Sequence, residues 1–243
     1  ESMFALRLNG AFVGMLTIAA TYWLGRELGL SRRVAMMAVA LLVVSFWHLV
    51  FSRLGFRAVS QPLLEALTVA ALFRGLRREQ WRWLVIGGIF LGLTGYTYLA
   101  SRMFPVLLLL ALLPLLLNRK QWQLRWAQLM VTAVTALLIL SPLLYYFYNH
   151  AAAFWVRIGQ VGTAANGLTP LGGYLRALEM FFLRGDPYIR FNVPERPLFS
   201  LLWGTLMVGG WVFTLTSWKR LRTDWQRSAA LLLLLAPLIM ILP

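Results

Sequence analysis

The amino-acid sequence predicts an all-α fold, a polytopic bundle of transmembrane helices, on three observations. Of the 243 residues, 60% are apolar and only 13% are charged. The mean hydropathy is +0.71, which is too high for a water-soluble domain. The apolar residues stand in runs close to the roughly 20 residues that a helix needs to cross a bilayer. The lipid bilayer is therefore the first expected partner of this chain.

Helices are the expected form of these runs because a helix satisfies its own backbone hydrogen bonds where no water is present. We expect about eight spans, of which the third and fifth are short and the last is cut by the end of the chain. They cover approximately residues 8–25, 34–51, 60–74, 83–99, 103–117, 127–147, 198–216 and 229–243. The predicted organisation is a six-span bundle over residues 1–147, a loop over 148–197 and two further spans over 198–243.

Lys and Arg are placed unevenly between the spans. The turns after the first, third, fifth and seventh spans carry 14 of them, whereas the short turns on the other side carry Arg53, Arg57 and Arg102. Cytoplasmic turns of membrane proteins are enriched in Lys and Arg, so the first set is predicted to be cytoplasmic. If the intact protein starts in the cytoplasm, one further span is expected before Glu1. The net charge of +15 is thus explained by topology, and no nucleic-acid partner is expected.

The segment 148–197 is too polar and too rich in Gly and Pro to span, and by the same count it lies outside the cytoplasm. A loop of this length is more often functional than a passive connection. Within it, the stretch 172–183 places five apolar or aromatic side chains on one helical face, namely Tyr174, Leu175, Leu178, Phe181 and Phe182. We predict an amphipathic helix on the outer membrane surface, with Arg176 and Glu179 toward water.

Polar side chains at the second turn are the first candidates for a site. Arg53 and Arg57 precede the third span, and Glu65 lies inside it. Arg suits phosphate because its planar guanidinium donates two parallel, charge-assisted hydrogen bonds, although both residues can instead extend to lipid headgroups. A carboxylate inside an apolar helix needs a partner or a wet cavity, so Glu65 is either a candidate catalytic residue or part of a structural ion pair.

The turn after the fourth span carries Tyr96, Tyr98 and Arg102. Arg102 follows Tyr98 by four positions, so the two share one face if the segment is helical. This arrangement suits a phosphate or a sugar, and the alternative is that the tyrosines are interfacial anchors.

The run 184–196 in the long loop concentrates further polar side chains. Asp186 is a second candidate base, although an Asp before Pro more often caps its own turn. Arg190 and Asn192 are candidate substrate ligands. With no Cys and only two His, the residues themselves predict no metal site.

Four stretches carry a resemblance to a known family: LRLNGAFVGMLTIAATYWLGRELG, WHLVFSRLGFRA, GLTGYTYLASRMFPVLLL and FLRGDPYIRFNVPERPLFS. They resemble bacterial membrane glycosyltransferases of the protein mannosyltransferase and aminoarabinose transferase type, which have the GT-C architecture. The resemblance implies a multi-pass enzyme of the prokaryotic plasma (inner) membrane. Such an enzyme moves a sugar from a polyprenyl-phosphate donor to a glycan, lipid or protein acceptor on the outer face. A divalent metal is compatible with this class, and nothing in the sequence demands one.

The resemblance also places the catalytic acid. In such families it sits in the first external loop, which would precede Glu1, in agreement with the expected upstream span. Family members often carry another acid shortly after the second external turn, where this chain has Val59, Ser60 and Gln61, with Glu65 the nearest acid.

A site hypothesis for this chain follows from these expectations. Arg57 and Arg102 are the first candidates for phosphate contacts, and Arg53 is the second. Tyr96 and Tyr98 would then shape a sugar or lipid pocket covered by the loop 184–196.

Two other functional classes are compatible with the pattern. A transporter or flippase of a lipid-linked or small polar substrate would have a midplane site reachable from both sides. A passive scaffold subunit would have no converging arginines at all. A cavity that opens on the outer face would favour sugar transfer.

Overall fold

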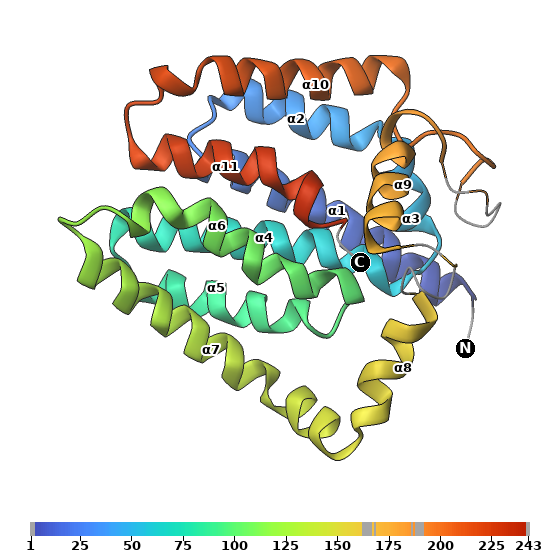
Figure 1. The fold of residues 1–243 in the computed structure, drawn as a ribbon, viewed down its shortest axis with the longest axis horizontal. Coiled ribbons are helices and arrows are strands. Elements are labelled where there is room, and N and C mark those ends of the chain that lie inside the picture. The colour runs from blue at the N-terminus through green and yellow to red at the C-terminus, as the bar shows by residue number, and fades with distance from the viewer. Residues whose placement is uncertain (1–2, 162–166, 168, 186, 188–191, 242–243) are drawn as a thin grey trace.

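Helices run back and forth between two ends of the molecule (Figure 1). This computed structural model describes residues 3–161, 167, 169–185, 187 and 192–241. The described residues form helices joined by turns, and they include no strand, so the predicted all-α class is confirmed. The elements are α1 (Met3–Glu27), α2 (Arg32–Val43), α3 (Phe46–Arg53), η1 (Arg57–Val59), α4 (Ser60–Arg78), α5 (Trp81–Thr94), η2 (Leu99–Met103), α6 (Phe104–Leu116), α7 (Trp122–Asn149), α8 (Ala151–Val161), α9 (Pro170–Phe182), α10 (Leu201–Thr216), η4 (Trp218–Arg220) and α11 (Asp224–Ile239).

Side-chain caps fix where several helices begin. The Ser31 hydroxyl accepts a hydrogen bond from the Val34 amide at the start of α2, and Thr169 does the same for Gly172 at the start of α9. Thr223 and Gln226 form a reciprocal capping box at α11. Each cap satisfies amide groups that the first turn of a helix leaves without a partner.

The core lies where α4, α5, α6 and α11 meet. Buried Leu, Phe and Ala side chains from these helices form one cluster, in which Leu84 and Ala111 are fully buried. The helix α4 is central: it packs on α1 and α5, while α6 packs on α11. Residues far apart in the sequence thus form one bundle, and the last described helix completes its core.

The expected number of eight spans is not confirmed. By length and composition, α1, α7 and the continuous η2–α6 segment can each cross a membrane, and the bent pair α2–α3 is a fourth candidate. The helices α5 and α10 have 14 and 16 residues, less than the roughly 20 that a full span needs. The helix α4 is long enough, but it carries three arginines and Glu65.

The expected span over residues 34–51 is broken. An axis change of 58° separates α2 from α3, with Ser45 as the first residue before α3. The segment 148–197, expected to hold one helix, contains two: α9 matches the predicted amphipathic helix, and α8 precedes it. The Arg176 and Glu179 side chains of α9 are exposed, as predicted.

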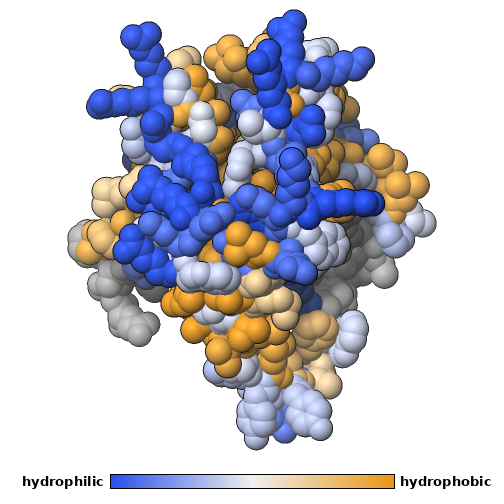
Figure 2. Space-filling model, turned by 90° about the vertical axis from the view of Figure 1, so that its left-hand side faces the viewer, coloured by the Kyte–Doolittle hydropathy of each residue, from blue (hydrophilic) through white to orange (hydrophobic). Residues whose placement is uncertain are grey.

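Most Lys and Arg residues gather at one end, the left-hand side of Figure 1, and Figure 2 shows that face. We call it the basic end, and it is formed by the turns after α1, α4, α6 and α10. Its cations are Arg26, Arg32, Arg33, Arg74, Arg77, Arg78, Arg82, Arg119, Lys120, Arg125, Lys219, Arg220, Arg222 and Arg227. The α2–α3 bend, η1 and η2 lie at the opposite end.

Candidate active site

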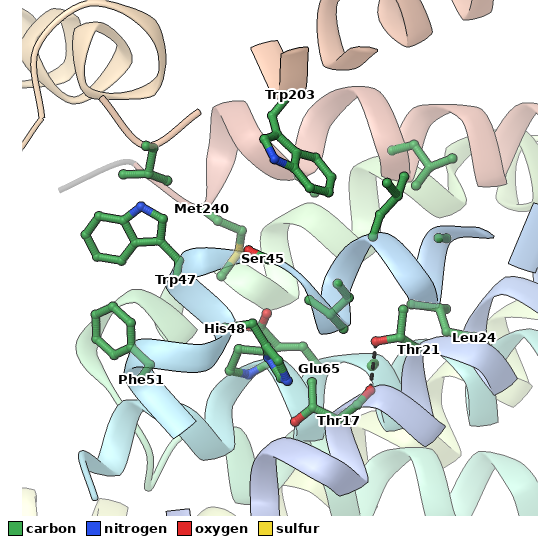
Figure 3. Close-up of a pocket in the computed structure, with 18 of the residues that line it drawn as sticks. Thr17, Thr21, Leu24, Ser45, Trp47, His48, Phe51, Glu65, Trp203 and Met240 are labelled. Atoms are coloured by element: carbon green, nitrogen blue, oxygen red, sulfur yellow. Dashed lines mark hydrogen bonds between the residues drawn. The ribbon is translucent and has the colours of Figure 1, made fainter. Parts of the chain in front are cut away.

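A groove of about 910 Å³ runs between α1, α2, α3, α4 and α11 (Figure 3). The segment 196–203 closes one side of it. Most of its lining is apolar, with Leu side chains from α1, α2 and α11 and the rings of Phe46, Trp47, Phe51, Phe199 and Trp203. An apolar groove of this size suits the hydrocarbon part of a ligand.

A small set of polar groups points into this apolar groove. They are Thr17 and Thr21 of α1, Ser45 before α3, His48 of α3, Glu65 of α4, Arg196, and Ser200 before α10. Figure 3 shows His48, Glu65 and Thr17 at the floor of the groove. The Thr17 and Thr21 hydroxyls donate to carbonyls of their own helix, at 2.9 and 2.8 Å, and so face the groove as acceptors.

Glu65 is the only acid among the groove-lining residues that the structure describes. Its Oε1 accepts a hydrogen bond of 2.7 Å from Nε2 of Gln61, which lies one turn earlier on α4 and is buried. No Lys, Arg or His forms an ion pair with Glu65 within the described part of the chain. A half-buried carboxylate with a neutral partner retains acceptor capacity for a ligand.

Close packing of α3 against α1 aims His48 at the groove. A Cβ atom at Gly10 would lie 2.8 Å from the carbonyl oxygen of Ser52, and one at Gly14 would lie 2.7 Å from the Ser52 Cβ. The same Gly14 position is 3.8 Å from Nε2 of His48. Only glycine at both positions lets α3 lie this close, and the imidazole then reaches α1.

A structured turn carries Arg196 to the mouth of the groove. The Leu198 and Phe199 amides donate to the carbonyls of Met180 and Phe181 at the end of α9, at 2.8 and 3.0 Å. The Arg196 guanidinium carbon lies 5.1 Å from the centre of the Phe46 ring. The side chain is exposed, so its cation is held at the mouth by a ring contact and remains open to an anion.

Asn192 supports this turn and does not line the groove. It is 4% exposed, and its Nδ2 donates to the Arg196 carbonyl at 2.6 Å. Gly185 lies so close to the same carbonyl that a Cβ atom there would overlap the carbonyl oxygen. Of the other candidates in this loop, Asp186 and Arg190 lie outside the described residues.

The other predicted arginines lie near the groove but do not line it. Arg53, Arg57 and Arg102 are exposed. The Phe56 and Tyr98 rings, 6.1 Å apart, bring the η1 and η2 turns together. These are the turns that carry Arg57 and Arg102.

Arg102 and Tyr96 also contact helices outside the groove. The Arg102 guanidinium carbon lies 4.2 Å from the centre of the Phe154 ring of α8. The Tyr96 hydroxyl donates to the Ile139 carbonyl of α7 at 2.9 Å, the contact of a structural anchor.

The sequence alone did not identify His48 or Arg196 as site residues. Nothing in the local sequence distinguishes them from other residues near helix ends, because the groove is formed by helices distant in sequence. In the part of the chain that the structure describes, no three His, Asp or Glu side chains lie close enough to hold a metal ion.

The family model of the dolichyl-phosphate-mannose-protein mannosyltransferases matches residues 1–146. The chain belongs to this family. Membership makes it a multi-pass membrane glycosyltransferase of the GT-C type, and it confirms the resemblance found in the sequence. The matched residues supply the groove walls from α1 to α4 and from α6. Comparisons with curated proteins and with solved structures found no significant match.

Proposed function

We propose that this protein moves a sugar from a polyprenyl-phosphate donor to a glycan, lipid or protein acceptor at the extracytoplasmic face of the plasma membrane. The observation that carries the proposal is the groove. Its apolar lining suits a polyprenyl chain, and the described residues that line it include one arginine, Arg196, and one acid, Glu65.

The expected orientation of the molecule in the membrane supports transfer at the outer face. If the basic end faces the cytoplasm, as the enrichment of cytoplasmic turns in Lys and Arg predicts, the α2–α3 bend and Arg196 face the opposite side. The segment 148–197, with α8 and α9, is then an extracytoplasmic loop. This placement keeps the proposed domain organisation, a bundle followed by an outer loop and two further passes.

The donor is proposed to bind with its lipid chain in the groove and its phosphate at the mouth. Arg196 is the first candidate for the phosphate because it lines the groove. Arg57 and Arg102, and then Arg53, are the further candidates, because η1 and the end of α3, which carry Arg57 and Arg53, adjoin groove-lining residues and η2, which carries Arg102, contacts η1. A guanidinium stabilises the charge of a leaving phosphate by paired hydrogen bonds.

The remaining candidates have supporting roles in this proposal. Tyr98 holds the η1 and η2 turns together through Phe56, and Tyr96 ties the second turn to α7. Asn192 shapes the turn that presents Arg196. Arg190 is a further candidate ligand on the same loop.

In the proposed reaction, an acceptor hydroxyl oxygen attacks the anomeric carbon of the sugar. The new carbon–oxygen bond forms as the bond from the anomeric carbon to the phosphate oxygen breaks, and the bonding electrons leave with polyprenyl phosphate. A carboxylate takes the hydroxyl proton. Glu65 is the candidate base that faces the groove, and Asp186 is the second candidate.

Release of polyprenyl phosphate tests the proposal whatever the acceptor is. The intact protein in native membranes is supplied with polyprenyl-phosphate-linked hexoses and aminopentoses, and free polyprenyl phosphate is measured. We expect release with at least one sugar, and Glu65→Gln and Arg196→Ala should each reduce it by about 100-fold or more. Glu179→Gln and Arg176→Ala, which change exposed residues of α9, are the matched controls.

The transporter alternative makes the opposite prediction. A flippase would move the sugar-linked lipid across the bilayer and leave the sugar attached to its phosphate. Movement of the intact donor with no release of polyprenyl phosphate would therefore replace the transferase proposal.

A further inference from the structure

The basic end contains more cations than its own acids neutralise. It has 14 Lys and Arg residues and three acids, Glu27, Glu79 and Asp224. Glu27 is already paired with Arg74 and Arg77, and the Glu79 carboxylate lies 3.9 Å from Arg125. Most of the exposed cations there have no acidic partner among the described residues, so this end presents a surplus of positive charge. Figure 2 shows this face as largely hydrophilic.

One part of the basic end is a concave hollow lined by cationic and aromatic residues. It has a volume of about 410 Å³ and is lined by the consecutive residues 119–124 of the turn between α6 and α7. Arg119 and Lys120 contribute exposed cations to it, and neither forms an ion pair in the described part of the chain. We call it the α6–α7 hollow.

Hydrogen bonds from both sides fix the shape of the α6–α7 hollow. The Asn118 Oδ1 atom accepts from the Lys120 amide at 3.1 Å, while Asn118 Nδ2 donates to Asp224 at 2.8 Å. Gln121 accepts from the buried Arg125 at 2.6 and 3.1 Å. The neighbouring acid and amide oxygens are thus engaged elsewhere, and the two cations remain available to an anion.

An apolar stripe on α7 leads away from the hollow. Trp122 and Trp126, whose ring centres are 5.6 Å apart, are followed at the same spacing of four by Met130 and Val134. All four are exposed, Met130 by 56%. Residues spaced by four form a ridge that winds slowly around a helix, so this stripe leads from the hollow along α7, which is long and apolar enough to cross a membrane.

We propose that the α6–α7 hollow binds the phosphate of an anionic phospholipid, with one acyl chain along the Trp122–Val134 stripe. Arg119 and Lys120 supply the charge, and the tryptophans supply the contact that aromatic rings make at the headgroup level. This site shares no lining residue with the groove. It is independent of the proposed sugar transfer.

The test is native mass spectrometry of the intact protein in detergent, titrated with dioleoylphosphatidylglycerol or dioleoylphosphatidylcholine. We expect the anionic lipid to bind at least about tenfold more tightly, and the Arg119→Ala/Lys120→Ala double variant to lose about tenfold. The matched control, Lys219→Ala/Arg220→Ala, removes the same charge from another turn of the basic end and should lose less than twofold. A second variant, Trp122→Ala/Trp126→Ala, should weaken the lipid without changing charge.

Three results would overturn the site. Equal losses in the two charge variants would mean diffuse attraction to the basic end. Equal binding of the two lipids would exclude a site selective for negative charge. Competition by inorganic phosphate as effective as that by the anionic lipid would assign the hollow to free phosphate. Thermal unfolding in lipid-free detergent shows whether each variant is folded before it is titrated.

Discussion

At the residue scale, Glu27 joins α1 to α4. Its carboxylate is 6% exposed and accepts from Arg74 at 3.0 Å, from Arg77 at 2.6 Å and from the Trp23 indole at 3.2 Å. Arg74 in turn lies over the Trp83 ring of α5, at 4.7 Å. One acid thus organises cations and rings from three helices, and its loss leaves two arginines without their counter-charge.

We predict that Glu27→Gln destabilises the fold. Breaking a buried ion pair by removing one partner is strongly unfavourable, and here both arginines are partly exposed, so about 2 kcal/mol is expected. The measurement is thermal unfolding in detergent, with Glu179→Gln as the control for loss of an exposed acid. A variant as stable as the control would show that the cluster contributes nothing to folding.

Arg102 provides a second prediction at this scale. Its guanidinium is exposed and contacts only the Phe154 ring among the described contacts, so Arg102→Ala should change the melting temperature little. If it contacts the donor phosphate, release of polyprenyl phosphate should fall at least about tenfold. Phe154→Ala keeps the Arg102 cation and removes its ring contact. Comparing release in the two variants separates the effect of the Arg102 charge from the effect of its position. Unchanged turnover in Arg102→Ala would remove this residue from the site.

At the scale of elements, α5 and α7 are held together by glycine. A Cβ atom at Gly88 would lie 2.6 Å from the Thr132 carbonyl oxygen, and one at Gly92 would lie 2.7 Å from that of Ala136. Both neighbours are backbone atoms, which cannot rotate away. Small residues permit this close approach of helices in membranes.

Gly88→Ala should therefore cost about 1–3 kcal/mol through overpacking. Gly209→Ala in α10 is the matched control, because nothing lies within 4 Å of a Cβ atom there and alanine favours helix. Thermal unfolding of both variants in the same detergent gives the comparison. Equal melting temperatures would contradict the tight α5–α7 contact.

The helices that could be predicted from the sequence are mainly those formed by long apolar runs. The runs that became α1 and α7 were found, and the amphipathic period of 172–183 identified α9. The α2–α3 bend was missed because no Pro or Gly interrupts the run 34–51. The sequence does not predict α8, because the composition of residues 148–197 indicates a polar loop.

Only part of the site was predictable, because a sequence shows local patterns and not contacts between distant residues. A polar residue within an apolar helix is visible in a sequence, so Glu65 could be singled out, and the structure places it in the groove. Arg196 could not, since its place at the mouth depends on backbone hydrogen bonds to α9 and on Phe46, 150 positions earlier in the chain.

At the scale of the whole molecule, the matched family region does not form the bundle alone. The match ends at residue 146, but Ala229, Leu232 and Ile239 of α11 belong to the core. α11 also lines the groove. The later part of the chain is therefore required both for packing and for the candidate site.

The concentration of Lys and Arg at one end predicts the orientation of the molecule in the membrane, and the proposed function depends on that orientation. Without an outward-facing mouth, Arg196 and Glu65 could not meet an extracytoplasmic acceptor. Residues 1–243 contain no Cys, so a single cysteine introduced among them can be labelled without background from the rest of these residues.

The most direct measurement is accessibility of Arg176→Cys and Lys219→Cys to a membrane-impermeant maleimide in intact cells. Both positions are exposed, one on α9 beside the groove mouth and the other at the basic end. The proposed orientation predicts labelling of the α9 cysteine in intact cells and labelling of the other only after permeabilisation. The reverse pattern would put the groove mouth in the cytoplasm and contradict transfer at the outer face.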